Sequence, residues 1–346
     1  MAAATAKHIE IVRSSRPWLN SLSQRSSDAL LALLQRHYTH VGVTIVNDLY
    51  DLQRLVSLQP DLVFLGMKFV PTDHSLGRLS PRIWLSEYLD NHDIAYTGSN
   101  RWAHELEFDK SKAKGRVLEA GLTTSPFHVV RQTDQLVEND IHIEFPLFVK
   151  PTDRGGGLGI DSDSVVKDFD ALRAKVHSIA TRYGSDALVE QYLPGREFSV
   201  AILKDTDSDA YTAMPIELIV PADDRGLKLL SSNVKSNDRE TAVAVMDLNL
   251  KSQVETLALD VFSALGARDY GRIDIRLDAD GTPHFLEANL IPSLIAGYGS
   301  FPKASMINCG LDYEQMILKI VSLGLTRQYD LADTSALSLR TFASIE

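Results

Sequence analysis

The sequence predicts a three-part α/β protein, with an N-terminal parallel sheet, a small central α+β unit and a C-terminal α+β unit. Three observations predict this fold class. Apolar runs with strand character alternate with helical segments over roughly the first hundred residues, as the crossovers of a parallel sheet require. A glycine-rich stretch at residues 155–159 follows a strand-like run in the middle of the chain. Near the C-terminal end, two segments of alternating polarity, residues 270–278 and 284–289, predict a β-hairpin.

Composition limits the classes of function. With 346 residues, of which 44% are hydrophobic, the chain can form two or three domains with ample cores. Its net charge of −11 argues against a broad nucleic-acid-binding surface. The single cysteine, Cys309, allows no internal disulfide. No signal peptide is evident, and no run approaches the ~18 to 20 apolar residues of a membrane span, so we expect a cytoplasmic protein without nucleic-acid or membrane partners.

The first unit is predicted from the spacing of its apolar residues. Strand-like and helical runs follow one another with short connections, which indicates helices packed on a parallel sheet. The expected elements are a strand at 8–13, a helix at 22–36, buried strands at 41–46 and 61–67 with a helix around 51–58 between them, a helix at 82–91, and a strand at 94–99.

The second and third units mix helices and strands less regularly. Residues 221–240 are polar and long for a connection, which is typical of a lid over an active site. The expected elements are a helix from 109 to 121, strands at 126–130 and 146–150, a helix at 168–183, a strand–turn–strand segment at 187–200, and strands at 200–203 and 211–220. We place the units at residues 1–105, 106–195 and 196–330, followed by a tail at 331–346.

The glycine-rich stretch is a candidate anion site. Four of the five residues 155–159 are glycine, so backbone N–H groups can turn inward around an anion, for which phosphate is the first candidate. Lys150 precedes the loop at a strand end, and Lys110 is a second candidate to neutralise the same phosphates. The alternative is a flexible loop between two strands. The stretch is neither a Gly-x4-Gly-Lys-Ser/Thr phosphate loop nor a Gly-x-Gly-x-x-Gly dinucleotide turn.

The hairpin is a candidate metal site. Residues two apart on a strand share a face, which places Arg272, Asp274 and Arg276 together and Glu287 with Asn289 on the facing strand. Carboxylate and amide oxygens suit Mg²⁺, which proteins usually hold through one or two carboxylates plus substrate phosphates. The alternative is a surface ribbon in which an arginine pairs with Asp274 as a minor stabilising contact.

Together, the ordered motifs resemble the ATP-grasp superfamily and, within it, the D-alanine–D-alanine ligase branch. The similarity covers residues 96–323 and includes Tyr96-Thr97-Gly98-Ser99, Asp109-Lys110, Lys150-Pro151, the glycine loop, Glu190 to Phe198, Gly271-Arg272-Ile273-Asp274, and Leu286-Glu287-Ala288-Asn289 with Pro292. The resemblance implies an ATP-grasp fold and an ATP-dependent ligase. In such ligases ATP phosphorylates a carboxylate to an acyl phosphate, and an amine then attacks to give an amide, with ADP and phosphate released.

The resemblance also implies a role for individual residues. The ATP phosphates would be contacted by Lys110, Lys150, Gly155, Gly156 and Gly157. The adenine region would be contacted by Glu190, Gln191 and Leu193, and the ribose by Glu197. Mg²⁺ (or Mn²⁺) would be bound by Asp274, Glu287 and Asn289. Arg272 would stabilise the tetrahedral intermediate, and Lys235 matches a lid lysine. From spacing alone, the alternative for Glu190 and Glu197 is that they are surface glutamates at strand ends, which are commoner than either binding role. We expect both hairpin carboxylates on an exposed face.

The chain also departs from the family pattern where the amino-acid substrates would bind. The family's first strand leads into a turn with a glutamate that holds the first amino group, whereas this chain continues Arg13-Ser14-Ser15-Arg16. One hypothesis is that Arg13 and Arg16 receive an acidic substrate, and the alternative is that both are solvated. After Asn289, Ser293 and Tyr298 stand near the expected acceptor pocket, which Tyr298 could close; the alternative is that Tyr298 is a packed loop tyrosine.

Three functions are therefore considered. The first is an ATP-dependent ligase of the D-alanine–D-alanine type that acts on small amino-acid-like substrates as a homodimer, the family's common state. The second is an ATP-grasp ligase of secondary metabolism that joins or cyclises another amino acid. The third is a nucleotide-binding protein that has lost catalysis. The chain retains together Lys150, Arg272, Asp274, Glu287 and Asn289. This argues against the third function, because a binding module has no evident need for the arginine.

Overall fold

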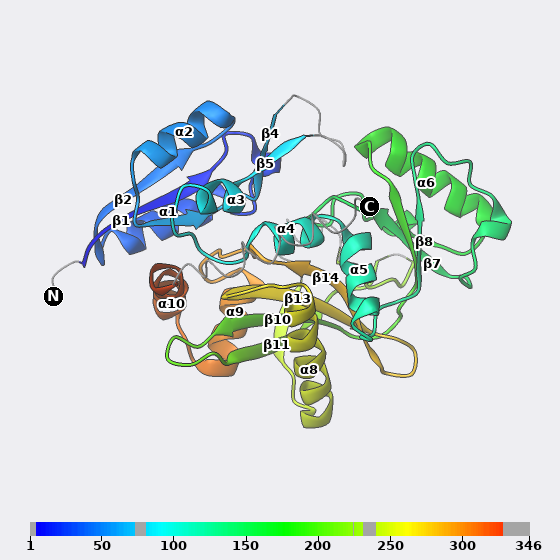
Figure 1. Ribbon diagram of the computed structural model, residues 1–346. Helices are drawn as coiled ribbons and strands as arrows, with labels where there is room; N and C mark the ends of the chain where they lie inside the picture. The colour runs from blue at the N-terminus through cyan, green and yellow to red at the C-terminus, as the bar shows by residue number, and fades with distance from the viewer. Residues whose placement is uncertain (1–4, 73–80, 224, 231–239, 328–346) are drawn as a thin grey trace, which may run out of the picture.

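The computed structural model describes residues 5–72, 81–223, 225–230 and 240–327. Figure 1 shows three sheet-containing bodies, with the N-terminal sheet and the central unit at opposite ends and the largest sheet beneath them. The helices are α1 (Gln24–Leu34), α2 (Leu49–Ser57), α3 (Leu85–Asp90), α4 (Arg101–Phe108), α5 (Lys110–Glu119), α6 (Phe169–Tyr183), α8 (Leu248–Ala264), α9 (Ser300–Cys309) and α10 (Tyr313–Thr326). Short 3-10 turns occur at Pro17–Leu19, Glu138–Asp140 and Ser162–Ser164.

The N-terminal sheet is parallel, as predicted. It has the order β2-β1-β3, from strands β1 (Thr5–Arg13), β2 (Tyr38–Ile45) and β3 (Leu62–Leu65). The predicted burial of both later strands was wrong for β2, which is the sheet edge and is half-exposed along much of its length, whereas all four residues of β3 are buried. Both strands end the sheet, but Val63 of β3 has a further parallel bridge to Tyr96, so burial depends on what covers the strand and apolar composition alone does not imply it.

Two further expectations for this unit need correction. The helix predicted over 82–91 begins three residues late, because β5 (Arg82–Trp84) pairs with β4 (Phe69–Pro71) and α3 follows it. The strand predicted over 94–99 is reduced to a single parallel bridge between Val63 and Tyr96. In both segments, contacts to residues distant in sequence decide the backbone, and local spacing does not contain that information.

The central unit is an antiparallel sheet with one long helix. Its order is β6-β9-β7-β8, from β6 (Phe127–Val130), β7 (Leu147–Pro151), β8 (Val165–Val166) and β9 (Ala187–Gln191). Helix α6 begins at the Asp168 cap, whose side chain accepts from the Ala171 N–H, and ends at Gly184 with a left-handed φ of 55°. Its Leu172 and Ile179 pack on the sheet and form a separate small core. The predicted strands and helix are confirmed here.

The third sheet carries the hairpin. Five antiparallel strands follow the order β12-β11-β10-β13-β14, from β10 (Glu197–Lys204), β11 (Tyr211–Ile219), β12 (Thr241–Ala244), β13 (Tyr270–Leu277) and β14 (Pro283–Asn289). Helix α8 packs on one face, whereas α9 contributes Phe301 to a core shared with the N-terminal sheet. The predicted hairpin is confirmed, and it lies at one end of this sheet.

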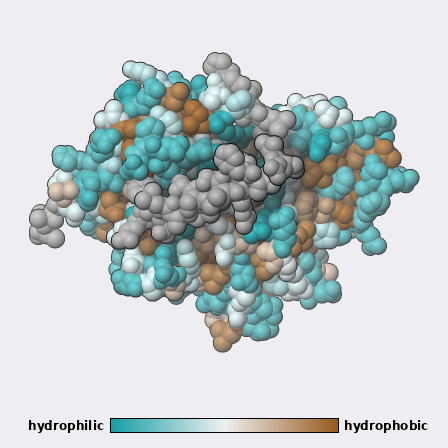
Figure 2. All heavy atoms as spheres, in the orientation of Figure 1, coloured by the Kyte–Doolittle hydropathy of each residue, from teal (hydrophilic) through white to brown (hydrophobic). Residues whose placement is uncertain are grey.

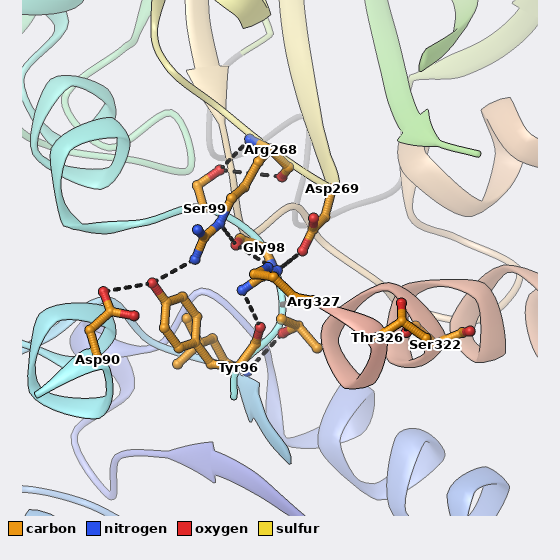
Figure 3. A network of polar contacts seen from close by, with 11 residues as sticks. Asp90, Tyr96, Gly98, Ser99, Arg268, Asp269, Ser322, Thr326 and Arg327 are labelled. Carbon is orange, nitrogen blue, oxygen red and sulfur yellow. Dashed lines mark hydrogen bonds and ion pairs between the residues drawn. The ribbon is translucent and has the colours of Figure 1, made fainter. Parts of the chain in front are cut away.

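A polar network fastens the N-terminal unit to the third sheet (Figure 3). The Tyr96 hydroxyl donates to Asp90 Oδ2 at 3.0 Å and accepts from Arg268 Nη2 at 2.7 Å. Arg327, just after α10, pairs with Asp269 and donates to the Tyr96 carbonyl at 2.8 Å. Helix α10 is also part of the shared core. The predicted unit boundaries stay a prediction; the one at residue 105 falls inside α4.

Candidate active site

A cleft of about 1050 Å³ opens where the three bodies meet. Each body contributes one wall, which is the arrangement expected for a site that must hold several reactants together. From the N-terminal unit the lining includes 17–21, Lys68, Arg82 and Glu107; from the central unit Lys110, Asp153, Arg154, Gly155 and Gly156; and from the third sheet Arg272, Asp274, Glu287, Asn289, Ser293 and Tyr298.

The hairpin register brings the predicted metal ligands together. Asp274 pairs directly with Glu287 across β13 and β14, and Arg272 pairs with Asn289. Asn289 Nδ2 donates to Asp274 Oδ2 at 3.2 Å. The expectation of an exposed carboxylate face was wrong for Asp274, which is only 5% exposed because it lies at the bottom of the cleft between neighbouring strands. Glu287 is more accessible, with 21% of its side chain exposed.

Asp274 is held by the arginine beside it. Arg272 donates through Nε to Asp274 Oδ1 at 2.9 Å and through Nη2 to Oδ2 at 2.8 Å, a two-point pair. Ser199 on β10 donates to Oδ1 at 3.0 Å. Burial lowers the pKa of Arg272, but the Asp274 charge outweighs it and leaves the pKa raised. This pair is therefore more than the minor surface contact considered as the alternative.

The donor set fits a hard divalent cation. Two carboxylates and one amide oxygen are chemically suited to Mg²⁺, which completes its shell with water and phosphate oxygens. Among the described residues no cluster of three or more His, Cys, Asp or Glu side chains forms a metal cage. Such a cage is not required of a cation held partly by its substrate. Lys110 Nζ lies 3.6 Å from Glu287 Oε2, so the predicted phosphate lysine and metal carboxylate meet in the cleft.

The glycine loop has the backbone that only glycine adopts easily. Gly156, Gly157 and Gly159 have φ values of 65°, 77° and 81°. Lys110 Nζ donates to the Arg154 carbonyl at 2.6 Å, which ties the first turn of α5 to the start of this loop. Burial lowers the pKa of Lys110, against the opposing effect of Glu287. A Cβ at Gly156 would meet nothing within 4 Å, so the loop has open space beside it.

A second, smaller cavity continues behind the first. Its lining includes Lys150, Gly157, Glu190, Gln191, Leu193, Glu197, Arg276 and Glu287, so most of the residues predicted to hold ATP border it. Glu190 is 2% exposed, and Lys150 Nζ lies 2.8 Å from its Oε2. Arg276 Nη1 donates to Glu197 Oε2 at 3.0 Å. The alternative that these glutamates are surface residues was wrong for Glu190, and Glu197 is only partly buried beside its arginine.

The remaining predicted residues are distributed unevenly. Ser293 and Tyr298 line the main cleft, and the Tyr298 hydroxyl lies 3.3 Å from Glu240 Oε1. Arg13 and Arg16 are not among the lining residues, which on this wall begin at Pro17. Lys235, the predicted lid lysine, lies outside the described residues.

A family model described as "D-ala D-ala ligase C-terminus" matches residues 117–322, more than half of the chain. A D-alanine–D-alanine ligase of Hydrogenovibrio crunogenus is 31% identical over 238 residues, which are 68% of this chain and 72% of that protein. The chain belongs to the D-alanine–D-alanine ligase family.

Two further comparisons concern the whole length of this family member. An uncharacterized protein of Sinorhizobium fredii is 29% identical over 320 residues, covering 91% of this chain and 90% of the relative. Crystal structures of the Bacillus anthracis D-alanine–D-alanine ligase, one of them complexed with ATP, superpose with TM-scores of 0.73 and 0.70 at 20% identity. They cover 92% and 93% of this chain, and 98% and 97% of their own. The predicted ATP-grasp fold is thereby confirmed.

Several site residues of this family member escaped the sequence prediction. Lys114 Nζ lies 2.7 Å from Glu190 Oε1 inside the protein. Lys68 lines the cleft with its Nζ 2.7 Å from Glu107 Oε1, and Ser300 accepts from Arg272 Nη1 at 3.2 Å. The only available signal was that Lys114 follows Lys110 by one helical turn, which places both on one face of α5. Lys68 and Glu107 are joined by tertiary structure alone.

No helix among the described residues is long and apolar enough to cross a bilayer. On the face seen in Figure 2, hydrophobic side chains occur in small groups among hydrophilic ones.

Proposed function

We propose that this chain is an ATP-dependent carboxylate–amine ligase that works through an acyl phosphate and releases ADP and phosphate. The observation that supports the proposal is that Lys110 Nζ lies 3.6 Å from Glu287 Oε2, because we propose that Lys110 neutralises phosphate and that Glu287 binds the metal ion. Membership of the D-alanine–D-alanine ligase family supports the same chemistry.

Each part of the cleft has a distinct task in this mechanism. The triphosphate would lie between the glycine loop and the hairpin, with Lys110 and Lys150 neutralising its charge. Phosphoryl transfer depends on such positioning and neutralisation more than on a protein nucleophile. The acid substrate attacks the terminal phosphorus through a carboxylate oxygen, and the P–O bond to ADP breaks.

Amide formation completes the reaction. The amine attacks the acyl carbon, and the negative charge that develops on the carbonyl oxygen would be stabilised by Arg272, which Asp274 and Ser300 hold in place. Phosphate then leaves as the C–O bond breaks. Mg²⁺, or Mn²⁺ in its place, would be held by Asp274, Glu287 and Asn289 and would neutralise charge on the phosphate oxygens when bound.

A second candidate keeps this chemistry and changes the acid. The described N-terminal wall of the cleft has one carboxylate, Glu107, and its Oε1 already accepts from the Leu290 N–H at 2.8 Å and lies 2.7 Å from Lys68. An amino-acid donor with a free ammonium group would find few acceptors on this wall. The scarcity of acceptors on this wall favours an acid other than D-alanine.

Substrate identity is tested by ADP release with ATP and Mg²⁺ over D- and L-amino acids, offered singly and in pairs, with mass spectrometry of products. A D-Ala-D-Ala product supports the first candidate. ADP released only with another acid supports the second and names the carboxylate. No ADP with any acid, in a protein that binds ATP, contradicts the ligase proposal and favours a nucleotide-binding role.

The family resemblance adds two proposals that concern the assembly and its location. We propose a homodimer in solution, for which light scattering gives the mass directly. We also propose the cytoplasm as the site of action, which fractionation of cells expressing the tagged protein would test.

A further inference from the structure

Lys114 on α5 is a completely buried lysine, with 0% of its surface exposed. An ammonium group has three hydrogens to donate, and here each has an acceptor inside the protein. Nζ lies 2.7 Å from Glu190 Oε1 and donates to Thr124 Oγ1 at 2.6 Å and Ser125 Oγ at 3.0 Å. Lys114 lines neither cavity. It therefore has no hydrogen left for a substrate and no path to one.

Glu190, which Lys114 contacts, does line a cavity. Glu190 lies between two ammonium groups, with Oε1 toward Lys114 and Oε2 at 2.8 Å from Lys150 Nζ. Both Glu190 and Lys150 line the smaller cavity beside the glycine loop. Lys114 is therefore the interior member of this group, and Glu190 and Lys150 both border the cavity.

The charges explain why this arrangement is stable. Burial raises the pKa of Glu190, but the two lysines outweigh it and lower the value to about 2. Burial lowers the pKa of Lys114 to about 8, against the opposing effect of Glu190. A buried carboxylate between two fixed ammonium groups is constrained at both oxygens, so its side chain cannot turn away from either lysine without exposing an unpaired charge to the interior.

Lys114 also connects this group to the hairpin. Thr124, which accepts from Lys114, donates to the Phe285 carbonyl on β14 at 2.7 Å. Phe285 lies two residues before Glu287, so a continuous set of hydrogen bonds runs from the phosphate lysine toward the metal-binding strand.

We propose that Lys114 is a positioning residue for nucleotide binding, which fixes Glu190 and, through it, the Lys150 ammonium in the geometry that receives ATP. The inference rests on the proposed ATP-dependent function. It assigns to Lys114 a role without contact to ATP, and it makes Glu190 and Lys150 one unit rather than two independent contacts.

The test compares Lys114→Met with Lys175→Met. Lys175 is a suitable control because its side chain is 5% exposed and belongs to the central unit, but it pairs with Asp161 at 2.7 Å and lines neither cavity. Isothermal titration of each protein with ATP and Mg²⁺ measures binding without turnover. We expect the Kd of ATP to rise by about 10²-fold in Lys114→Met, as a misplaced binding group commonly causes. The Kd should stay near wild type in Lys175→Met, and the KM for ATP should change far more than kcat.

A double-mutant cycle separates positioning from general structural damage. If Lys114 acts through Glu190, then Lys114→Met should weaken ATP binding much less in a Glu190→Gln background than in the wild type. Equal losses in the two backgrounds would overturn the proposal. An equally large loss of ATP affinity in Lys175→Met would also overturn the proposal, because removal of any buried lysine of this unit would then have the same effect.

A more conservative substitution provides the test if Lys114→Met does not fold. Thr124→Val removes one acceptor of the Lys114 ammonium, keeps all three charges, and alters a residue outside both cavities. We expect a rise of about 2- to 10-fold in the Kd of ATP from the lost hydrogen bond, and an unchanged Kd would contradict the inference. Wild-type protein that binds no ATP would instead contradict the proposed function, and the inference with it.

Discussion

Asp274 and Glu287 face each other as direct partners across β13 and β14, yet they differ in what surrounds them. The Asp274 side chain is 7% exposed and is held at two points by Arg272, whereas the Glu287 side chain is 21% exposed and has Lys110 at 3.6 Å. The Asp274 carboxylate is thus part of the cleft wall, whereas the Glu287 carboxylate is accessible to a molecule bound in the cleft.

Glu287→Ala is therefore expected to abolish ADP formation and leave the fold intact. The change removes a partly exposed carboxylate that we propose as a metal ligand, so we expect kcat to fall by at least about 10²-fold, as for loss of one fixed charge-stabilising group. ADP release at increasing Mg²⁺ gives the measurement. The control is Glu217→Ala, which removes a carboxylate of the same sheet that pairs with Arg196 and lines neither cavity. Wild-type turnover in Glu287→Ala would exclude this residue from the metal site.

Asp274→Asn should lose both activity and stability. Arg272 has 12% of its side chain exposed, and removal of the Asp274 charge leaves its guanidinium without a counterion at 2.8 Å. Breaking a buried pair from one side costs about 3–5 kcal/mol in the free energy of unfolding. Urea unfolding checks this, with Glu287→Ala as the comparison. Equal stability of the two variants would show that the Arg272 pair is not important to the fold.

The sequence predicted the hairpin and its ligands because strand periodicity fixes which side chains share a face. The Asp274–Glu287 pairing also depends on a register shift between Asp274 and Ile275, which moves the partner of Asp274 from Leu286 to Glu287 and is not contained in that period. Burial of Asp274 was not predictable in the same way, because it comes from β10, whose Ser199 lies beside it and is distant in sequence. The same reason applies to Lys114 on α5, whose partner Glu190 lies on β9, distant in sequence.

Errors in the predicted fold have a similar physical origin. Local sequence predicts β5 as the start of a helix, because it does not contain the pairing of β5 with β4. It predicts β2 as buried, because it does not contain the place of β2 at the sheet edge. Helix α10 falls in the predicted third unit, and its core residues, such as Ile317, pack in the core that the third sheet shares with the N-terminal sheet. Local pattern gives an element's type, whereas its neighbours are set by tertiary packing.

Glu190→Gln should make stability less dependent on acid pH. In the wild type the pKa of Glu190 is about 2, against the ordinary 4.5. The unfolded chain therefore takes up a proton first as the pH falls, and the stabilising contribution, fully present above about pH 4.5, is lost toward pH 2. At neutral pH we expect the variant to be less stable by about 3–5 kcal/mol, because two buried ammonium groups lose their carboxylate.

Urea midpoints between pH 2 and pH 7 measure this difference. The gap between wild type and Glu190→Gln should be largest above pH 4.5 and should close toward pH 2. A gap that stays constant over this range would mean that the Glu190 charge does not contribute to stability.

Gly159→Ala and Gly155→Ala should behave differently in one loop. Gly159 has a φ of 81°, and an added Cβ would lie 2.6 Å from Pro151 Cγ. A left-handed backbone at a non-glycine residue costs about 1–3 kcal/mol, before any clash is counted. Gly155 has no left-handed φ, and a Cβ there meets nothing within 4 Å. Thermal unfolding should show a lower Tm for Gly159→Ala only, and equal Tm values would contradict the loop conformation.

Tyr96→Phe tests the junction between the N-terminal unit and the third sheet. The substitution keeps the ring, which lies 5.2 Å from the Arg268 guanidinium and 5.3 Å from that of Arg327. It removes the hydroxyl that joins Arg268 to Asp90, whose pKa burial already raises. The Asp90 carboxylate and the Arg268 guanidinium then each lose a hydrogen-bond partner, which should reduce the free energy of unfolding by about 1–3 kcal/mol.

The control for this junction is Tyr50→Phe, since Tyr50 is 68% exposed. A surface change of this kind usually alters stability by less than about 0.5 kcal/mol. Tyr96 lines neither cavity, so the Kd of ATP should stay at its wild-type value in Tyr96→Phe. Unchanged stability would mean that the hydroxyl contacts do not hold the two units together. Weakened ATP binding at wild-type stability would mean that the junction controls the cleft directly, because the change would then act on the relative placement of its walls and not on the fold.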